Sequence, residues 1–268
     1  MSESQSFPSF HSDKVGQGQQ EVLISVLDQQ AELASIQRMR SWASGALALR
    51  PGERALDIGS GTGSEVVAMA AAVGADGRAI GVDPNPDMVA LAASRAAGTP
   101  AAFVEGNAYQ LPFPDDSFDA VRCERVFQHL DRPERAAAEI ARVLRPGGRA
   151  IVIDSDWATA IMHPVDPEIV AALMGPRAAQ APNRNSGRRL RGLLTGAGFT
   201  IDDIGSEAVI FDPAMSAPMY AAQAAAAVAS GIITAAQADQ AAAEIEHGIA
   251  TGDYLFSVTM YAVVGHLA

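Results

Sequence analysis

The sequence of 268 residues contains one cysteine, one lysine and no long apolar run. The single cysteine, Cys123, cannot form an internal disulfide, and no segment approaches the length of a membrane span. Residues 1–4 also lack the basic and apolar regions of a secretory signal. These absences lead us to expect a soluble globular protein of the cytoplasm.

Basic residues are scarce relative to acidic ones, and the formal net charge is −12 at pH 7. Proteins bind nucleic-acid phosphates through clustered lysine and arginine, so we expect no nucleic-acid partner. The only lysine, Lys14, does not stand in the Gly-Lys-Ser/Thr ending that a phosphate-binding P-loop needs. The five histidines show no paired ligand spacing, so no metal site is expected.

Glycine, by contrast, is concentrated in the stretch ALDIGSGTG at residues 55–63. Its first half is a short apolar run that holds one carboxylate, Asp57, and its second half has a glycine at every other position. This pattern predicts a buried strand that opens into a tight loop, where a ligand can touch the backbone. Residues 64–73 are rich in alanine and predict a helix whose positive N-terminal end points at the loop.

The glycine spacing distinguishes between possible ligands. The dinucleotide fingerprint is G-x-G-x-x-G, whereas here the third glycine, Gly63, arrives one residue early. A pyrophosphate would be repelled by Asp57, but a ligand with an ammonium group would be attracted. Twenty positions beyond Gly63, a second apolar run ends in Asp83, which can accept two hydrogen bonds from ribose hydroxyls. The two acids together predict an adenosine-type ligand with a cationic tail.

With these motifs, the chain resembles the class I S-adenosylmethionine-dependent methyltransferases, and more narrowly the small-molecule branch that includes ubiquinone and menaquinone biosynthesis enzymes. The resemblance continues through residues 104–108, 111–119 and 144–148. It implies an α/β fold of the Rossmann-like kind, with a seven-stranded, mostly parallel sheet and helices on both faces. The alternation of strand and helix patterns in the middle of the chain independently favours a parallel sheet.

The resemblance also implies which residues hold S-adenosylmethionine. Those expected at the methionine end of the cofactor are Asp57, Gly59, Ser60, Gly61 and Gly63. Asp83 is expected to bind the ribose, and Pro84 to line the adenine. The remaining adenine contacts are expected from Ala108 and from Asn107, whose carbonyl oxygen can act as an acceptor.

Four charged side chains are further candidates for the methionine end. Glu124 and Arg125 follow the predicted fourth strand and could reach the cofactor, or equally pair with each other or with the neighbouring helix. In related enzymes an arginine from the N-terminal helices often meets the cofactor carboxylate, and Arg38 or Arg40 could do so. The alternative for both arginines is a solvated place on a helix face.

A general base is usually needed when oxygen or carbon accepts the methyl group, and histidine is the natural residue. His129 is the first candidate because it follows the fourth strand, close to where the methyl group should emerge; the alternative is a structural or cofactor-shell role. His163 is the second candidate. Asp154 and Asp156 end the fifth strand and could orient a substrate, or be solvated loop acids.

The chain is expected to form a single domain with three regions. Residues 1–50 are predicted as an N-terminal helical cover, residues 51–156 as the cofactor-binding core, and residues 157–268 as the C-terminal half of the sheet. This last region is expected to carry an irregular substrate-covering segment over residues 156–186 and a helical insertion at residues 213–250. The insertion is interpreted as a lid or as an oligomer contact, and a homodimer is a possible assembly.

The predicted activity is transfer of a methyl group from S-adenosylmethionine to oxygen, carbon or nitrogen of a small organic acceptor, such as a secondary metabolite or a quinone-like compound. Two alternatives stay open. A protein of this fold can bind the cofactor and catalyse a rearrangement without using its methyl group. A nicotinamide-dependent oxidoreductase is the other alternative, disfavoured by the glycine spacing and by Asp57.

Overall fold

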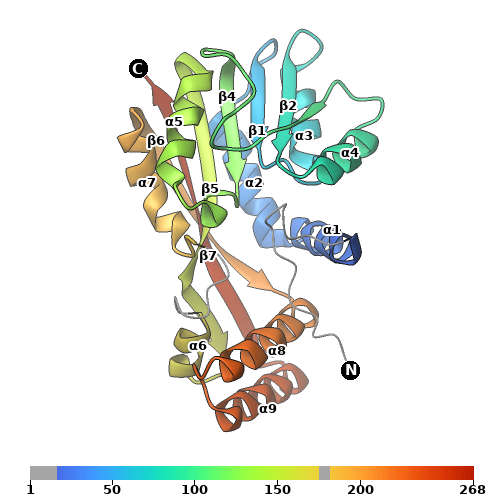
Figure 1. The fold of residues 1–268 in the computed structure, drawn as a ribbon, viewed down its shortest axis with the longest axis vertical. Coiled ribbons are helices and arrows are strands. Elements are labelled where there is room, and N and C mark those ends of the chain that lie inside the picture. Colours follow the sequence, from blue (N-terminus) through green and yellow to red (C-terminus); the bar gives the residue numbers. More distant parts are fainter. Residues whose placement is uncertain (1–16, 175–181) are drawn as a thin grey trace.

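The computed structural model describes residues 17–174 and 182–268 (Figure 1). The strands are β1 (Arg54–Ile58), β2 (Arg78–Asp83), β3 (Ala102–Glu105), β4 (Phe118–Glu124), β5 (Leu144–His163), β6 (Phe199–Phe211) and β7 (Leu255–Leu267). The helices are α1 (Gln17–Ala31), α2 (Ala34–Leu47), α3 (Ser64–Val73), α4 (Pro86–Arg95), α5 (Pro133–Val143), α6 (Pro167–Leu173), α7 (Ser186–Gly196), α8 (Pro213–Ala229) and α9 (Ala235–Thr251), with a 3-10 helix at Phe127–His129. Residues 1–16 of the expected N-terminal cover lie outside the described residues.

The strands form one seven-stranded sheet in the order β3-β2-β1-β4-β5-β7-β6. Strands β1 to β5 pair in parallel, and β7 lies antiparallel between β5 and β6. The chain runs outward from β1 to β2 and β3, and then returns to place β4 on the other side of β1. This reversal opens a crevice at the carboxyl ends of β1 and β4, where ligands bind in such sheets. The predicted fold class is therefore confirmed.

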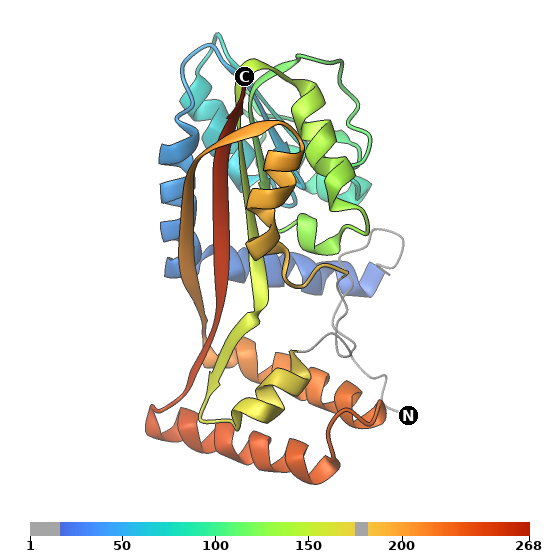
Figure 2. The same cartoon turned by 90° about the vertical axis from the view of Figure 1, so that its left-hand side faces the viewer.

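Helices cover both faces of the sheet (Figure 2). Helix α2 packs with Ile151 and Ile153 of β5 in one core cluster, whereas α5 and α7 pack with Val152 in another. Consecutive residues of β5 are thus buried on opposite faces. This double burial explains why the central strands read as continuous apolar runs.

Short local signals set the starts of several helices. The side chains of Asn85, Asp166 and Asp212 each accept a hydrogen bond from the backbone N–H two residues later, at 2.7–2.9 Å. A proline follows each of them and begins α4, α6 or α8. The cap satisfies one free N–H, and proline at the first position loses no hydrogen bond.

The last three strands extend beyond the helical layers and carry α6, α8 and α9 at their far end (Figure 2). The expectation that the chain is irregular directly after Asp156 was wrong, because β5 continues to His163 and pairs with β7. Asp156 pairs with Thr259 and Ile161 pairs with Ser257, so β5 has three more residues than β7 between these two pairs. The three extra residues form a bulge. The Thr159 hydroxyl stabilises it, accepting from the N–H of Thr259 at 2.8 Å and donating to the Asp156 carbonyl at 2.7 Å.

None of the helices in the described residues combines the length and the apolar character needed to cross a membrane.

Ile151→Ala should lower the free energy of unfolding by about 2–5 kcal/mol, because Ile151 has no exposed surface and its truncation leaves a cavity. Chemical denaturation would measure the loss. The matched control is Ile210→Ala on β6, whose side chain is 49% exposed and should matter little. Equal losses in the two variants would show that the core has been misplaced.

Candidate active site

One large cavity lies at the carboxyl ends of β1, β2 and β4, where the strand order reverses. It has a volume of about 760 Å³ and reaches from the glycine loop after β1 to helix α8, which lies below these strand ends in Figure 1. The predicted residues that line it are Arg40, Asp57, Gly59, Ser60, Gly61, Asp83, Pro84, Asn107, Ala108, Glu124, Arg125 and His129. The structure therefore brings most of the predicted site into one place.

The loop after β1 can form only with glycine at its key positions. Gly59 has φ +73°, and a Cβ there would lie 2.3 Å from the Val126 side chain. Gly63 has φ +88°, and a Cβ there would lie 2.8 Å from Ala92 and from Phe103. Gly63 does not line the cavity, so its predicted contact with the cofactor is not supported. Its role is to let the loop pass close to the helix and strand behind it.

Two polar groups of this region have hydrogen-bonding capacity left for a ligand. The carboxylate of Asp83 accepts one backbone N–H on each oxygen, from Gly61 and from Asn85, both at 2.9 Å. Each oxygen keeps a further lone pair. Burial raises the pKa of the Asp83 carboxyl, and the two N–H groups oppose this rise. The Ser60 hydroxyl is buried and has no hydrogen-bond partner among the described residues, so its donor and acceptor capacity is unused.

Asn107 lines the cavity, but its carbonyl oxygen is already used. This oxygen accepts the backbone N–H groups of Tyr109 at 2.9 Å and of Gln110 at 3.1 Å, which closes a turn. Asparagine readily forms such turns with the backbone two residues on. The expectation that Asn107 meets the adenine as an acceptor is therefore corrected, because the group it can direct to a ligand is its NH₂ donor.

A cluster of charged side chains fills the space between β1, β4 and α2. Arg40 of α2 donates to both oxygens of Glu124, each at 3.0 Å. Arg122 donates to Asp57 at 3.0 Å and also pairs with Glu124. Glu65 of α3 lies 3.3 Å from Arg40 and 3.2 Å from Arg122. The cluster thus ties two strands and two helices together at the wall of the cavity.

Two other predicted arginines have different surroundings. Arg125 lies 3.3 Å from Glu124 and also bonds to Gln30 of α1, so it joins the cluster to the first helix. Its φ of +57° is unusual outside glycine, a strain that proteins tend to keep at functional sites. Arg38 does not line the cavity and pairs with Glu207 of β6. A contact of Arg38 with the cofactor is therefore not supported. Arg38 and Arg40 are two positions apart on α2, and residues with this spacing do not share a helix face.

Burial and neighbouring charges shift the pKa values of two acids of the cluster in opposite directions. Burial raises the pKa of Asp57 to about 6; Arg122 limits the rise and the charge of Glu65 adds to it. Burial would also raise the pKa of Glu124, but Arg122 and Arg40 outweigh it and hold this pKa well below its usual range. Of these two acids, Asp57 is consequently the one that changes charge at about pH 6.

His129 ends the short 3-10 helix after β4 and lines the cavity, as predicted. His163, the second candidate base, lies outside this cavity, is exposed and sits 3.2 Å from Asp253. Asp154 has no exposed surface and accepts the N–H groups of Gln128 and Ser155, each at 2.8 Å. Asp156 is equally buried and pairs with Arg188. Because both acids are buried, neither is a solvated loop acid. Neither lines the cavity, so a contact with a substrate is not supported.

The far half of the cavity is apolar and was not identified from the sequence. Its lining residues are Leu33, Ile36, Val209, Phe211, Met219, Ala222, Ala225, Ala226, Ala229, Val258 and Met260. They come from the N-terminal helices, from β6 and β7, and from α8. The spacing of Met219, Ala222, Ala226 and Ala229 on α8 was a usable signal, because steps of three and four residues mark one face of a helix.

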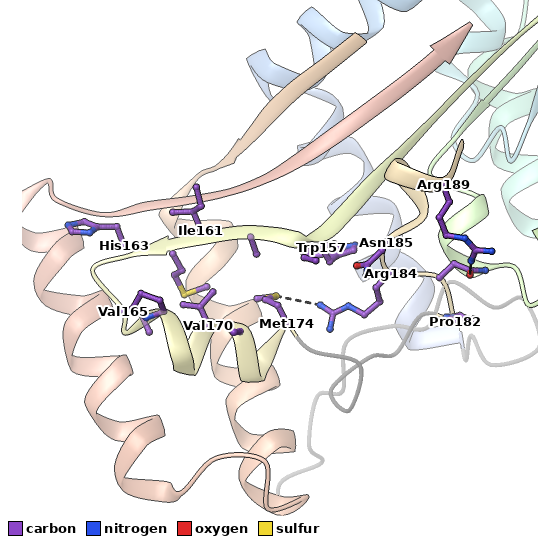
Figure 3. Close-up of a pocket in the computed structure, with 16 residues that line it drawn as sticks. Trp157, Ile161, His163, Val165, Val170, Met174, Pro182, Arg184, Asn185 and Arg189 are labelled. Atoms are coloured by element: carbon purple, nitrogen blue, oxygen red, sulfur yellow. Dashed lines mark hydrogen bonds between the residues drawn. The ribbon is translucent and has the colours of Figure 1, made fainter. Parts of the chain in front are cut away.

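A second cavity of about 670 Å³ lies along the end of β5, between this strand, α6 and residues 182–189 (Figure 3). It shares Trp157 and Arg184 with the first cavity. The guanidinium of Arg184 lies 5.7 Å from the centre of the Trp157 ring, and the Trp157 indole N–H donates to Gln128 at 3.0 Å. The Trp157 ring is thereby fixed where the two cavities adjoin.

A family model described as a methyltransferase domain matches residues 56–152. Over 247 residues the chain is 35% identical to an uncharacterised 37.1 kDa transposon protein of Streptomyces fradiae, a match that covers 90% of this chain and 70% of that protein. Over 110 residues it is 39% identical to the demethylmenaquinone methyltransferase of Symbiobacterium thermophilum, covering 40% of this chain and 44% of that enzyme. The chain belongs to the class I S-adenosylmethionine-dependent methyltransferases.

The fold agrees with this family. The crystal structure of the 4+2 cyclase SpnF superposes with a TM-score of 0.60 at 23% identity, over 100% of this methyltransferase and 99% of that protein. A likeness at this identity concerns the fold. The chain spans less than half the length of the demethylmenaquinone methyltransferase. The family model ends at residue 152, before β6, α8 and β7, which wall most of the apolar half.

S-adenosylmethionine is the cofactor of this family, and the polar half of the cavity fits it. The loop of Gly59 and Gly61 offers bare backbone, Asp83 keeps free lone pairs for a diol, and the buried Ser60 hydroxyl lacks a partner. These are the groups that a nucleoside with a polar tail requires.

The affinity for S-adenosylhomocysteine should fall as the pH drops below about 6, by up to about tenfold per pH unit. Burial raises the pKa of Asp57 to about 6, so the carboxyl is protonated below this pH and the attraction predicted between it and the cofactor's ammonium group is lost. Calorimetry between pH 5 and pH 7.5 would measure the slope. Asp57→Asn should abolish it, and an identical slope in both proteins would show that another group is responsible.

Proposed function

We propose that this methyltransferase transfers a methyl group from S-adenosylmethionine to a small organic acceptor held in the same cavity. The observation that carries the proposal is the continuity of one cavity from the glycine loop to α8. Its polar half has the groups that suit the cofactor, and its apolar half leaves room for a second molecule. When bound, S-adenosylmethionine supplies a methyl group that its sulfonium already activates.

The residues of the chain would mainly bind and orient the two reactants. Asp83 would accept hydrogen bonds from the ribose hydroxyls, and the backbone of residues 59–61 would hold the methionine end. The NH₂ of Asn107 and the backbone of Ala108 would flank the adenine. Aligning two reactants and excluding water can account for about 7–11 kcal/mol of a barrier.

The N-terminal helices help to exclude water from this site. Leu27 of α1 and Ile36 of α2 line the cavity, and Arg40 anchors α2 to Glu124 at its wall. Because a buried carboxylate and guanidinium are both costly to leave unpaired, this anchor favours a closed arrangement of α2. Closure in turn strengthens polar contacts inside the cavity.

His129 is proposed as the base that removes a proton from an oxygen or carbon acceptor. It lines the cavity directly after β4, and imidazole changes charge near neutral pH. Several of the relatives are demethylmenaquinone methyltransferases, and a quinone-like acceptor would suit the apolar half of the cavity. The cytoplasmic location and the homodimer stay predictions.

The proposal is tested by calorimetric titration with S-adenosylmethionine, S-adenosylhomocysteine and NAD, followed by acceptor screening for release of S-adenosylhomocysteine. Binding of the first two ligands and release of product with an acceptor are expected. Binding of NAD alone would reverse the assignment. Cofactor binding with acceptor turnover but no S-adenosylhomocysteine would indicate a rearrangement instead.

Asp83→Ala should weaken S-adenosylhomocysteine binding by about 1.5–3 kcal/mol, because hydrogen bonds from the ribose to a charged group are lost. Calorimetry measures this change, and Asp87→Ala on the exposed first turn of α4 is the control. Unchanged affinity in Asp83→Ala would mean that the ribose lies elsewhere.

His129→Ala should reduce turnover by about 10²–10⁴-fold, the usual contribution of a general base, while cofactor affinity stays the same. The rate of S-adenosylhomocysteine release with an acceptor found by the screen measures turnover. The control is His247→Ala on the exposed side of α9. A loss of cofactor affinity in His129→Ala would assign this residue to cofactor binding.

A further inference from the structure

Helix α8 presents a row of small side chains to the cavity. Its lining residues, called here the alanine face, are Met219, Ala222, Gln223, Ala225, Ala226 and Ala229. The other side of α8 is packed: Tyr220, Ala224 and Ala227 are buried, and the Tyr220 hydroxyl donates to the carbonyl of Ala238 in α9 at 3.2 Å. Helix α9 therefore supports α8 from behind, while the alanine face borders open space.

The cavity residues from β6 and β7 are apolar and well fixed. They are Val209 and Phe211 on β6, and Val258 and Met260 on β7. All four are buried, and the ring of Phe211 stacks on Phe256 with centroids 5.0 Å apart. A surface of this kind gains free energy by covering apolar ligand atoms, because apolar area leaves water.

The charged residues that line the cavity come from elements other than β6, α8 and β7. They are Arg40, Asp57, Glu65, Asp83, Arg122, Glu124, Arg125, Asp131 and Arg184. Among the described residues of those three elements, Gln223 is the single polar side chain that lines the cavity. A charged group placed there would lose its hydration without gaining an opposite charge, which is strongly unfavourable.

We infer that the acceptor is a bulky, uncharged and mainly apolar molecule whose body lies against the alanine face of α8. Ala222 and Ala226 are then specificity-determining residues, because their single methyl groups set the space available. The Gln223 amide can pair with one hydroxyl or carbonyl of such a molecule. This inference rests on the proposed function, and it adds the chemical class of the acceptor and the residues that limit its size.

Two fluorescent probes with the same ring framework test the charge requirement. N-phenyl-1-naphthylamine is neutral, and 8-anilinonaphthalene-1-sulfonate carries one sulfonate in addition. Titrated into the protein saturated with S-adenosylhomocysteine, the neutral probe should bind with one equivalent per chain and at least about tenfold more tightly than the sulfonate. Equal or tighter binding of the sulfonate, or no binding of the neutral probe, would overturn the inference.

Bulky substitutions on α8 locate the binding site. Ala226→Phe should weaken the neutral probe at least about tenfold, because the ring fills the space that the probe needs. Ala222→Leu is a milder second variant if the first fails to fold. Ala221→Phe is the matched control, because Ala221 is an exposed residue of the same helix that does not line the cavity. A control that weakens the probe as much as Ala226→Phe contradicts the assignment.

Cofactor affinity separates failure of this inference from failure of the proposed function. Ala226→Phe should leave the calorimetric affinity for S-adenosylhomocysteine unchanged, since the alanine face lies at the other end of the cavity from Asp83 and Asn107. If the wild-type protein binds S-adenosylhomocysteine but not the neutral probe, the acceptor class is wrong and the cofactor assignment stands. If it binds no S-adenosylhomocysteine, the proposed function falls first.

Discussion

The guanidinium of Arg122 is the centre on which the active site depends. It is buried in the middle of the sheet and pairs with Asp57 on the neighbouring strand, with Glu124 on its own strand and with Glu65 on α3. With Arg40 and Arg125 the cluster holds three cations against three acids. A balanced set of charges can be buried, whereas loss of a single member leaves an unpaired charge that costs several kcal/mol.

This cluster also fixes the position of the N-terminal helices over the polar half of the cavity. Arg40 fastens α2 and Arg125 fastens α1, so both N-terminal helices are attached through the same group, Glu124. Near the glycine loop, ion pairs and hydrogen bonds therefore hold the two helices. Elsewhere the contacts are apolar, since Ile36 and Met39 of α2 pack in one core cluster with residues of β5. The wall near the glycine loop is polar and fixed by ion pairs, and the wall near α8 is apolar.

How much of this arrangement could be predicted depends on the distance in sequence between the interacting residues. The glycine loop, Asp83 and the helix at residues 64–73 were readable because each depends on neighbours within a few positions. The charge cluster was not, because Asp57 and Arg122 are 65 residues apart and Arg40 and Glu124 are 84 apart. The continuation of β5 to His163 was not predicted, because a bulge interrupts the strand. The role of the Asn107 carbonyl oxygen was not predicted either, because the residue type does not reveal that this oxygen closes a turn.

The position of β7 has a consequence for how the protein folds. Strand β6 pairs only with β7 in the described sheet, and β5 meets β7 across about 100 residues of chain. Until Leu255–Leu267 inserts between them, both strands expose unpaired edges, and the apolar half of the cavity has no wall. Contacts of such high sequence separation form slowly, because the entropy of closing a long loop must be lost first. The polar half of the cavity can thus assemble from nearer neighbours, whereas the apolar half is expected to be the last part of the molecule to become ordered.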